Sequence, residues 1–282
     1  MEYHYSPIDC LIIFGVSYCT LTLLFFTLHI TYALPKFLDN LKVKLKGPLL
    51  FVTAHPDDEC MFFGPSLVEA LNQIGKENVY LLCLTNGDYY GQGTIREREL
   101  LQSCAEFGMI RDHVEIVKAR DLQDGNSEWN MDRVIEEILN AVKKFDIKYI
   151  VTFDDYGVSG HVNHQSIYKS LCRMKRSSIR NLHKDIKLFS LESVNLLRKY
   201  ISIFDLVLSV IHCLVKQYTE GRKLKLIMLN WKDIKVPRNA MYRHRSQFVW
   251  FRKLYIVFSR YMLINTLNVE GSVAFDRTNL DH

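Results

Sequence analysis

Two clusters of ionisable side chains along this chain are placed where they could act together on a substrate. The first is Ala54-His55-Pro56-Asp57-Asp58-Glu59, an imidazole and three carboxylates directly after a short apolar run at 49–53. The second is Gly160-His161-Val162-Asn163-His164, which also follows a strand-like segment. Carboxylates crowded into a turn repel one another unless a cation offsets their charge, and a divalent metal is the usual cation. Together the clusters predict one hydrolytic metal site.

His55, Asp58 and His164 form the candidate metal-binding set. Hydrolytic zinc sites typically use three nitrogen or oxygen ligands and leave one position for water. Bound zinc lowers the pKa of that water towards about 7 and polarises a carbonyl oxygen. Asp57 lies beside the ligands and is the candidate base for the proton of the water. His161 is the candidate for stabilising an oxyanion or protonating a leaving nitrogen.

A structural role is the alternative for several of these residues. Aspartate before a helix is a common N-cap, so Asp57 or Asp58 could serve only to begin the next helix. Glu59 could cap that helix or orient the loop, and His161 could support a ligand without taking part in the reaction. Two carboxylates combined with a distant His-x-x-His pattern favour the metal site over these alternatives.

Alternating strand-like and helix-like segments position the two clusters. Short apolar runs typical of buried strands occupy residues 49–54, 79–84, 114–117 and 148–153. Helical periodicity occupies residues 64–74, 95–107, 131–145 and 163–174. This alternation predicts an α/β fold with a Rossmann-like, doubly wound and mostly parallel sheet. The first and fourth strands of such a sheet usually lie side by side, and ligands bind beyond their carboxyl ends, where both clusters lie.

The pattern is weaker after residue 176. Residues 187–191 and 224–229 could be further strands. Residues 201–215 are apolar but carry Asp205 and His212, so they suit a core or membrane-surface helix better than a membrane crossing. Residues 243–260 combine aromatic and basic side chains, which predicts either a surface helix near anionic lipid or a helix packed on the core.

An apolar segment near the N-terminus predicts a membrane anchor. Residues 10–34 are almost wholly apolar or small and are about long enough to cross a bilayer. A cleaved signal peptide has a basic start, whereas this chain has Glu2 and Asp9 before the apolar run. Lysines follow the run, so the positive-inside rule places the body of the chain in the cytoplasm. We expect a short lumenal N-terminus over 1–9, a transmembrane helix over 10–34, a basic linker over 35–47 and a cytoplasmic catalytic domain over 48–282.

Composition limits the classes of function. The 282 residues are 48% hydrophobic, which suits one large domain with a full core. The net charge of +5 is mild, and the basic runs lack the aromatic interleaving of a stacking platform, so no nucleic-acid partner is expected. Seven cysteines without a CxxC spacing argue against a disulfide framework and a thiolate zinc site. They fit a reducing compartment.

The sequence His-Pro-Asp-Asp-Glu after a strand, with Gly-His-x-Asn-His downstream, resembles the PIG-L/LmbE-like family of zinc-dependent de-N-acetylases. The apolar N-terminus, Tyr-Arg-His-Arg-Ser-Gln at 242–247 and Val-Trp-Phe-Arg at 249–252 are similar to one branch of that family. The resemblance implies hydrolysis of the acetamide of N-acetylglucosaminyl-phosphatidylinositol to glucosaminyl-phosphatidylinositol and acetate, the second step of GPI-anchor biosynthesis. It also implies a single-pass protein of the endoplasmic reticulum membrane whose catalytic domain faces the cytoplasm.

The family pattern implies a role for each matching residue. Its metal ligands match His55, Asp58 and His164, with Zn²⁺ or another divalent ion as cofactor. Its general base matches Asp57, and its transition-state histidine matches His161. The alternatives are a deacetylase of another N-acetyl sugar conjugate and a catalytically inactive, membrane-tethered scaffold.

The resemblance also implies a substrate loop after the second strand. Arg96 suits the anionic phosphate of the lipid head group, although Arg96 and Glu99 could instead form a solvated pair on one helix. Asn86 or Asp88 could contact sugar hydroxyls, and His244 is a further substrate-site candidate.

Asn163 departs from the family pattern, because bacterial relatives often carry aspartate at this position. The change removes one possible charge partner of His161. Asp154 or Asp155 could replace that partner.

Overall fold

The structure is a computed structural model that describes residues 14–22, 24, 41–177, 184–221, 223–229 and 232–275. It divides the chain into two compact units, Met1–Lys42 and Val43–His282. The second unit contains both clusters predicted to be functional.

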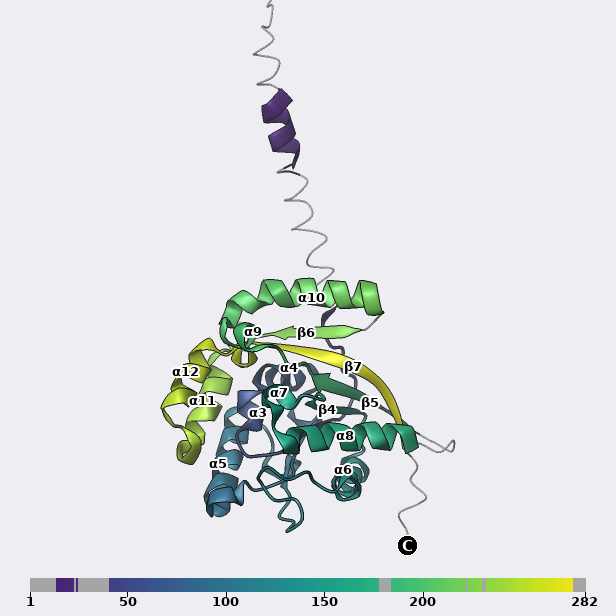
Figure 1. The fold of residues 1–282 in the computed structure, drawn as a ribbon, viewed down its shortest axis with the longest axis vertical. Coiled ribbons are helices and arrows are strands. Elements are labelled where there is room, and N and C mark those ends of the chain that lie inside the picture. The colour runs from purple at the N-terminus through teal and green to yellow at the C-terminus, as the bar shows by residue number, and fades with distance from the viewer. Residues whose placement is uncertain are drawn as a thin grey trace, which may run out of the picture. The chain divides into compact units, whose positions relative to one another are not determined.

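A mixed sheet of seven strands forms the centre of the second unit (Figure 1). Its order is β3-β2-β1-β4-β5-β7-β6. The strands are β1 (Leu49–Thr53), β2 (Val79–Cys83), β3 (Val114–Ile116), β4 (Tyr149–Phe153), β5 (Lys184–Leu191), β6 (Leu224–Met228) and β7 (Ile264–Phe275). Strands β1 to β5 pair in parallel, whereas β7 pairs antiparallel with β5 and β6. The expected adjacency of the first and fourth strands is therefore confirmed.

Helices cover the parallel part of the sheet. Helices α4 (Gly64–Ile74) and α5 (Gly93–Glu106) make the first two crossovers, α6 (Met131–Phe145) connects β3 to β4, and α8 (Val162–Ser177) follows β4. Right-handed crossovers place α4 and α5 on one face and α6 and α8 on the other. Because both faces are covered, all five residues of β1 and of β4 are buried.

Helix α6 shows how the sequence specifies these elements. The Asn130 side chain accepts hydrogen bonds from the backbone N–H groups of Asp132 and Arg133, which caps the helix. Its buried residues recur at helical spacing, and its last turn carries two lysines that complement the helix dipole. The helix ends where Asp146 takes a left-handed conformation with φ of 52°.

Short helices shape the loops around the site. Helix α3 (Asp58–Met61) follows β1 and α7 (Gly157–Gly160) follows β4. The 3₁₀ turns are η2 (Lys76–Asn78), η3 (Asp88–Tyr90), η4 (Arg111–His113), η5 (Ser202–Phe204), η6 (Arg245–Gln247) and η7 (Arg260–Met262).

The C-terminal part of the chain differs from its prediction. Helices α9 (Leu196–Tyr200) and α10 (Asp205–Glu220) precede β6, and α11 (Lys235–Arg243) and α12 (Trp250–Phe258) precede β7. The single helix predicted over residues 243–260 is thus divided by the turn η6. Strand β7, which joins β6 to the sheet, was not predicted from the sequence.

The predicted membrane anchor is corrected by the structure. In the part of the chain that the structure describes, no helix has the length and apolarity needed to cross a bilayer. Residues 14–22 are helical, which is roughly 14 Å at 1.5 Å per residue, against a hydrocarbon core of about 30 Å. Most of the remaining predicted span lies outside the described residues. The prediction of a single-pass protein is therefore wrong on this finding.

Candidate metal and catalytic site

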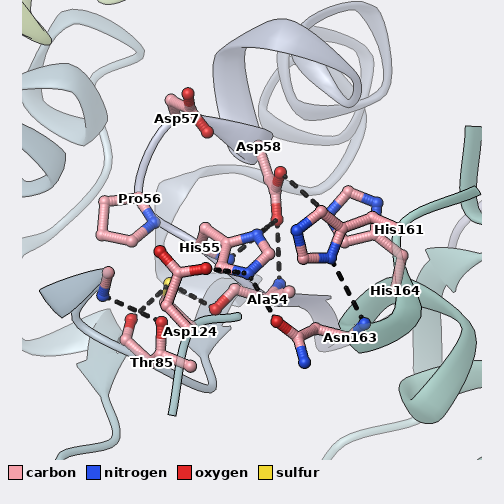
Figure 2. A network of polar contacts seen from close by, with 12 residues as sticks. Ala54, His55, Pro56, Asp57, Asp58, Thr85, Asp124, His161, Asn163 and His164 are labelled. Carbon is pink, nitrogen blue, oxygen red and sulfur yellow. Dashed lines mark hydrogen bonds and ion pairs between the residues drawn. The ribbon is translucent and has the colours of Figure 1, made fainter. Parts of the chain in front are cut away.

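Asp58 fixes the loop that leaves β1. Its Oδ2 accepts hydrogen bonds from the backbone N–H groups of Ala54 (3.0 Å) and His55 (2.8 Å). Oδ1 lies 3.3 Å from His164 Nε2, and Oδ2 lies 3.7 Å from His55 Nδ1. Burial alone would raise the pKa of Asp58, but the two imidazoles hold it well below its usual range. Asp58 is therefore an ionised carboxylate between two rings (Figure 2).

His164 turns its Nε2 towards that carboxylate. Its Nδ1 lies 2.9 Å from the Gly157 carbonyl, which can only accept, so Nδ1 is protonated. Nε2 is buried and has no hydrogen-bond partner among the described residues. The ring stacks on Phe153 at 3.8 Å between centroids, which fixes its plane. A buried ring nitrogen that faces a buried carboxylate is stabilised by a shared cation, either a proton or a metal ion.

His55 is oriented in the same way from the other side. Its Nε2 lies 3.0 Å from Asn163 Oδ1 and 3.2 Å from Asp124 Oδ1, so Nε2 is the donor and Nδ1 faces Asp58. Asn163 itself is held because Oδ1 also accepts from Gly125 N and Nδ2 donates to the Ser127 carbonyl. Burial lowers the pKa of His55, but the carboxylates of Asp124 and Asp58 outweigh this and raise it. Asn163 thus serves His55, contrary to the expectation that its side chain faces His161.

These donors fit a divalent metal such as zinc. His55, His161 and His164 each offer a ring nitrogen within 4.8 Å of the other two. Asp58 adds a carboxylate beside two of these rings, and imidazole with carboxylate is a common donor set for catalytic zinc. Hydrogen bonds to the far nitrogens of His55 and His164 fix both tautomers, as supporting residues do around metal sites. The structure therefore brings the predicted ligands together.

Asp57 occupies a strained backbone position next to the ligands. Its φ of 115° is rare for a residue with a side chain and costs on the order of 1–3 kcal/mol. The conformation is supported by Glu59, whose Oε2 accepts from the Asp57 N–H at 3.0 Å. Asp57 Oδ2 pairs with Arg252 at 2.9 Å. Burial raises the pKa of Asp57, while Arg252 opposes the rise.

His161 is half-buried at the edge of the same cluster. Its ring centroid lies 4.6 Å from that of His55 and 5.0 Å from that of His164. Burial and these two neighbours lower the pKa of His161 to about 4, so the ring is neutral near pH 7. Nδ1 accepts from the backbone N–H of Asn163 at 3.3 Å, which leaves the proton on Nε2. Asp154, suggested as a charge partner, instead binds Ser193 and the Gly157 N–H.

A pocket of about 350 Å³ opens over these residues. Its other walls come from the C-terminal helices and include Lys199, Tyr200, Phe251, Arg252 and Tyr255. No hydrogen bond or ion pair joins the Lys199 ammonium to another described residue, and burial together with Arg252 lowers the pKa of Lys199. The pocket thus combines a polar floor with an aromatic and cationic rim.

Arg96 lines this pocket but is engaged by the protein. Its NH1 donates to the Gly87 carbonyl and pairs with Asp124, and its NH2 donates to the Pro56 carbonyl and to Gln247. These four bonds, all of 3.1 Å or less, join the loop after β1 to η6. Arg96 therefore positions the site loop, and the alternative of a solvated pair with Glu99 is excluded because Glu99 binds Ser246.

The remaining predicted substrate residues lie away from the metal ligands. Asn86 donates to Glu97, and Asp88 Oδ1 accepts from the Gly93 N–H at the start of α5. Asn86 and Asp88 line a second pocket of about 740 Å³, which meets the first at Asp124.

The structure does not bring His244 to either pocket. It is fully buried and lies 2.6 Å from Glu59, whose negative charge outweighs burial and raises the pKa of His244. Ser103 donates to the same Glu59 oxygen, and the pKa of Glu59 is lowered despite its burial. The buried pair holds Glu59 in place beneath Asp57, so His244 acts as a supporting residue.

Asp124 and Arg252 are the site residues that sequence reasoning missed. Asp124 binds both His55 and Arg96, and Arg252 binds Asp57. Asp124 follows β3 within an irregular loop with no strand or helix signal. Arg252 is the last residue of the family-like sequence Val-Trp-Phe-Arg, but that sequence alone did not indicate which residue Arg252 contacts.

Imidazole and carboxylate side chains gathered under a pocket at the carboxyl edge of a mixed α/β sheet are the arrangement that hydrolytic metal enzymes use. Among solved structures, the deacetylase–teicoplanin complex of teicoplanin biosynthesis is similar to this chain with a TM-score of 0.52. The match covers 81% of this chain and 99% of that chain at 13% identity, so it shows the fold alone.

Sequence comparison identifies the family. The PIG-L family, described as GlcNAc-PI de-N-acetylase, matches residues 50–174. The N-acetylglucosaminyl-phosphatidylinositol de-N-acetylase of Bos taurus is 41% identical over 220 residues, covering 78% of this chain and 82% of that protein. The probable enzyme of the same name from Dictyostelium discoideum is 38% identical over 249 residues, covering 79% and 93%. The chain belongs to the PIG-L family, which confirms the resemblance carried by the two histidine clusters.

Proposed function

We propose that this chain hydrolyses the acetamide of N-acetylglucosaminyl-phosphatidylinositol to glucosaminyl-phosphatidylinositol and acetate, the second step of GPI-anchor biosynthesis. Residues 48–282 are the catalytic domain in this proposal. The observation that carries it is the buried Nε2 of His164, which faces the Asp58 carboxylate at 3.3 Å and has no hydrogen-bond partner among the described residues. That arrangement needs a cation, and it lies beneath a pocket in a chain of this family.

His55, Asp58 and His164 would hold the metal, for which we propose zinc. When bound, zinc supplies a Lewis acid that polarises the acetyl carbonyl and lowers the pKa of water. Asp58 would offer Oδ1 to the metal, because Oδ2 holds the loop through two backbone N–H groups. His164 and His55 would offer Nε2 and Nδ1, since their other nitrogens are committed as donors.

Asp57 moves the proton in the proposed reaction. Its carboxylate accepts a proton from the water that attacks the acetyl carbon. The same carboxyl group then gives that proton to the sugar nitrogen as the carbon–nitrogen bond breaks, so the products are a free amine and acetate. Arg252 at 2.9 Å holds the carboxylate in place and favours its ionised form.

His161 stabilises the oxyanion of the tetrahedral intermediate. A neutral ring whose Nδ1 accepts from the Asn163 N–H presents Nε2–H as a donor. Such a donor suits developing negative charge on the carbonyl oxygen. The alternative in which a charged His161 protonates the leaving nitrogen is disfavoured, because its pKa of about 4 leaves little charged form near pH 7.

Lys199 is the proposed contact of the substrate phosphate. Arg96 is already engaged by four protein oxygens, whereas the Lys199 ammonium lies on the pocket rim near the rings of Phe62, Tyr200 and Tyr255. A phosphodiester in the pocket could form an ion pair with this ammonium without breaking an existing ion pair of Lys199. Asn86 and Asp88 remain proposed contacts of the sugar or inositol through the adjoining pocket.

A side-by-side assay tests the function. Acetate release is measured from N-acetylglucosaminyl-phosphatidylinositol and from water-soluble N-acetylglucosaminides, with metal content determined on the same preparation. We expect turnover of the glycolipid to exceed that of the others and to require bound metal. Preferential turnover of a lipid-free sugar would favour another N-acetyl substrate. A metal-free protein without turnover would favour a scaffold.

A further inference from the structure

Helix α10 turns its apolar side chains away from the protein. The exposed positions follow helical spacing, with Val207 64%, Ile211 51%, Leu214 45% and Tyr218 92% exposed. The buried positions are Asp205, Ser209 and Cys213. A surface helix normally buries its apolar stripe and exposes its polar side chains, so α10 has the opposite arrangement.

A buried polar network fixes this orientation. Asp205 is fully buried and pairs with Arg198 at 2.7 Å and with Arg260 at 3.0 Å. Arg260 is also fully buried, and it donates to Thr266 on β7. Rolling α10 to bury its apolar stripe would break these ion pairs and leave buried charges unpaired, which is strongly unfavourable. The outward apolar stripe is therefore built into the fold.

Helix α12 repeats the arrangement beside it. Trp250 is 72% exposed, and the same outer stripe contains Phe251, Leu254, Val257 and Phe258, each about half exposed, whereas Tyr255 and Ile256 are buried. The two helices are joined through α9 and η5, since Ser202 donates to the Val257 carbonyl and the rings of Tyr200 and Tyr255 lie 6.2 Å apart. Figure 1 shows α9 between α10 and α12.

The connecting segment is equally apolar. Leu196 and Leu197 are each 74% exposed, and Phe204 is 76% exposed. We call the outer side chains of α9, η5, α10 and α12 the apolar face. Exposed apolar side chains gathered on neighbouring elements in this way are typical of an interaction surface.

The apolar face continues into the active-site pocket and carries positive charge. Tyr200 and Phe251 belong to both the face and the pocket wall. Helices α9 and α12 with η5 contain no acidic residue and four cations, of which Arg198 pairs with Asp205 and Arg252 with Asp57. Lys199 and Lys253 form no ion pair with another described residue and supply the positive charge of the face. Aromatic and basic side chains around an apolar surface suit the interface of a bilayer with anionic head groups.

We propose that the apolar face docks on the surface of an anionic lipid bilayer, so that the pocket opens at the level of the lipid head groups. The choice of a bilayer over a protein partner rests on the proposed function: the acyl chains of the glycolipid stay in the bilayer while its sugar enters the pocket. Neither α10 nor α12 crosses the bilayer in this arrangement.

Quenching of Trp250 tests the docking directly. The full chain is mixed with phosphatidylcholine–phosphatidylserine vesicles that contain brominated acyl chains, and tryptophan emission is compared with that of Trp250→Phe. The chain also contains Trp129 and Trp231, so the quenching that is lost in Trp250→Phe is the part due to Trp250. The apolar N-terminal residues are a second route to vesicle binding, so total binding alone would not identify the face. Quenching of Trp250 reports contact of the face itself with the acyl chains. Vesicle-bound protein whose Trp250 is not quenched would overturn the proposal.

A matched pair of variants measures the contribution of α10. Ile211→Glu places a charge on the face at a 51% exposed position, and Ile95→Glu places the same charge at a 45% exposed position on α5. Burial of one such side chain accounts for about tenfold or more in partitioning, so Trp250 quenching should need about tenfold more lipid in Ile211→Glu only. Equal behaviour of the two variants would contradict the proposal. A different outcome is that the wild type forms a dimer without lipid and that Ile211→Glu does not. The face would then be assigned to contact with a second copy of the chain.

Turnover separates this inference from the proposed function. Ile211→Glu should hydrolyse vesicle-held glycolipid more slowly than the wild type and a lipid-free head-group analogue equally fast. If the wild type hydrolyses neither substrate, the proposed function fails, and Trp250 quenching still decides the docking. If Ile211→Glu hydrolyses vesicle-held substrate at the wild-type rate, docking through α10 is refuted.

Discussion

Removing the Arg252 guanidinium should shift the pH dependence of hydrolysis. Arg252 lies 2.9 Å from Asp57 Oδ2 and is 22% exposed, while Asp57 is 7% exposed. A nearby opposite charge lowers the pKa of a carboxyl group, and hydrogen bonds to charged groups are worth about 1.5–3 kcal/mol. The partial exposure of Arg252 places this pair near the lower end of that range, and about 1.4 kcal/mol corresponds to tenfold in an equilibrium constant.

The sign of the shift follows from the role of Asp57. A base acts in its ionised form, and burial already raises the pKa of Asp57. Arg252→Gln should raise it further, which moves the acid limb of the profile of kcat/KM to higher pH. On that limb kcat/KM should fall about tenfold, and above it the variant should approach the wild type.

The assay is the profile of kcat/KM against pH for acetate release from a lipid-free head-group analogue, with Lys253→Gln as the matched control. Lys253 is the next residue along α12, is exposed, and carries the same charge without lining the pocket. We expect its profile to match that of the wild type. An equal loss at every pH in Arg252→Gln would mean that Arg252 binds substrate and does not tune Asp57. No change at any pH would refute a role for the ion pair.

Three further variants test the surrounding structure. His244→Gln should lower the free energy of unfolding by about 3–5 kcal/mol, because it leaves the buried Glu59 charge unpaired. Thermal unfolding measures this loss. A changed KM with unchanged stability would instead support a substrate-binding role for His244. Gly157→Ala should abolish metal binding, since its Cβ would lie 2.6 Å from the Cβ of His164 at a φ of +68°; near-wild-type metal content would contradict this. Lys199→Gln should raise KM about tenfold for phosphate-containing substrate and leave KM unchanged for an analogue without phosphate, and an equal effect on both would argue against the phosphate contact.

The stability from the Glu59–His244 pair should itself depend on pH. The pKa of His244 is raised in the folded state, so its contribution is complete below the ordinary histidine pKa and is lost as pH rises through the raised value. The pKa of Glu59 is lowered, so the pair also weakens as pH falls through that lowered value.

The site residues that could be predicted from the sequence are those that follow the ends of strands. His55 and Asp58 follow the end of β1 within five residues, and His164 lies in the first turn of α8, the helix that follows β4. A parallel sheet brings the ends of adjacent strands together. The helices and strands up to residue 174 were predictable for the same reason, because buried parallel strands and amphipathic helices have clear hydrophobic patterns.

The unpredicted parts depend on contacts between distant segments. Arg252 contacts Asp57 from α12, which follows η6, and η6 is held by Glu99 on α5. Strand β7 mixes polar with apolar residues and gains its identity from pairing with β5 and β6. No local pattern records such pairings, and hydrophobic content alone led to an incorrect single-pass topology.

The most direct test of the proposed chemistry is acetate release from N-acetylglucosaminyl-phosphatidylinositol with bound metal measured in the same sample, for the wild type and for His164→Ala. The proposal predicts about one metal per chain and steady turnover in the wild type, and loss of both in the variant. Full turnover by a metal-replete His164→Ala protein would contradict it.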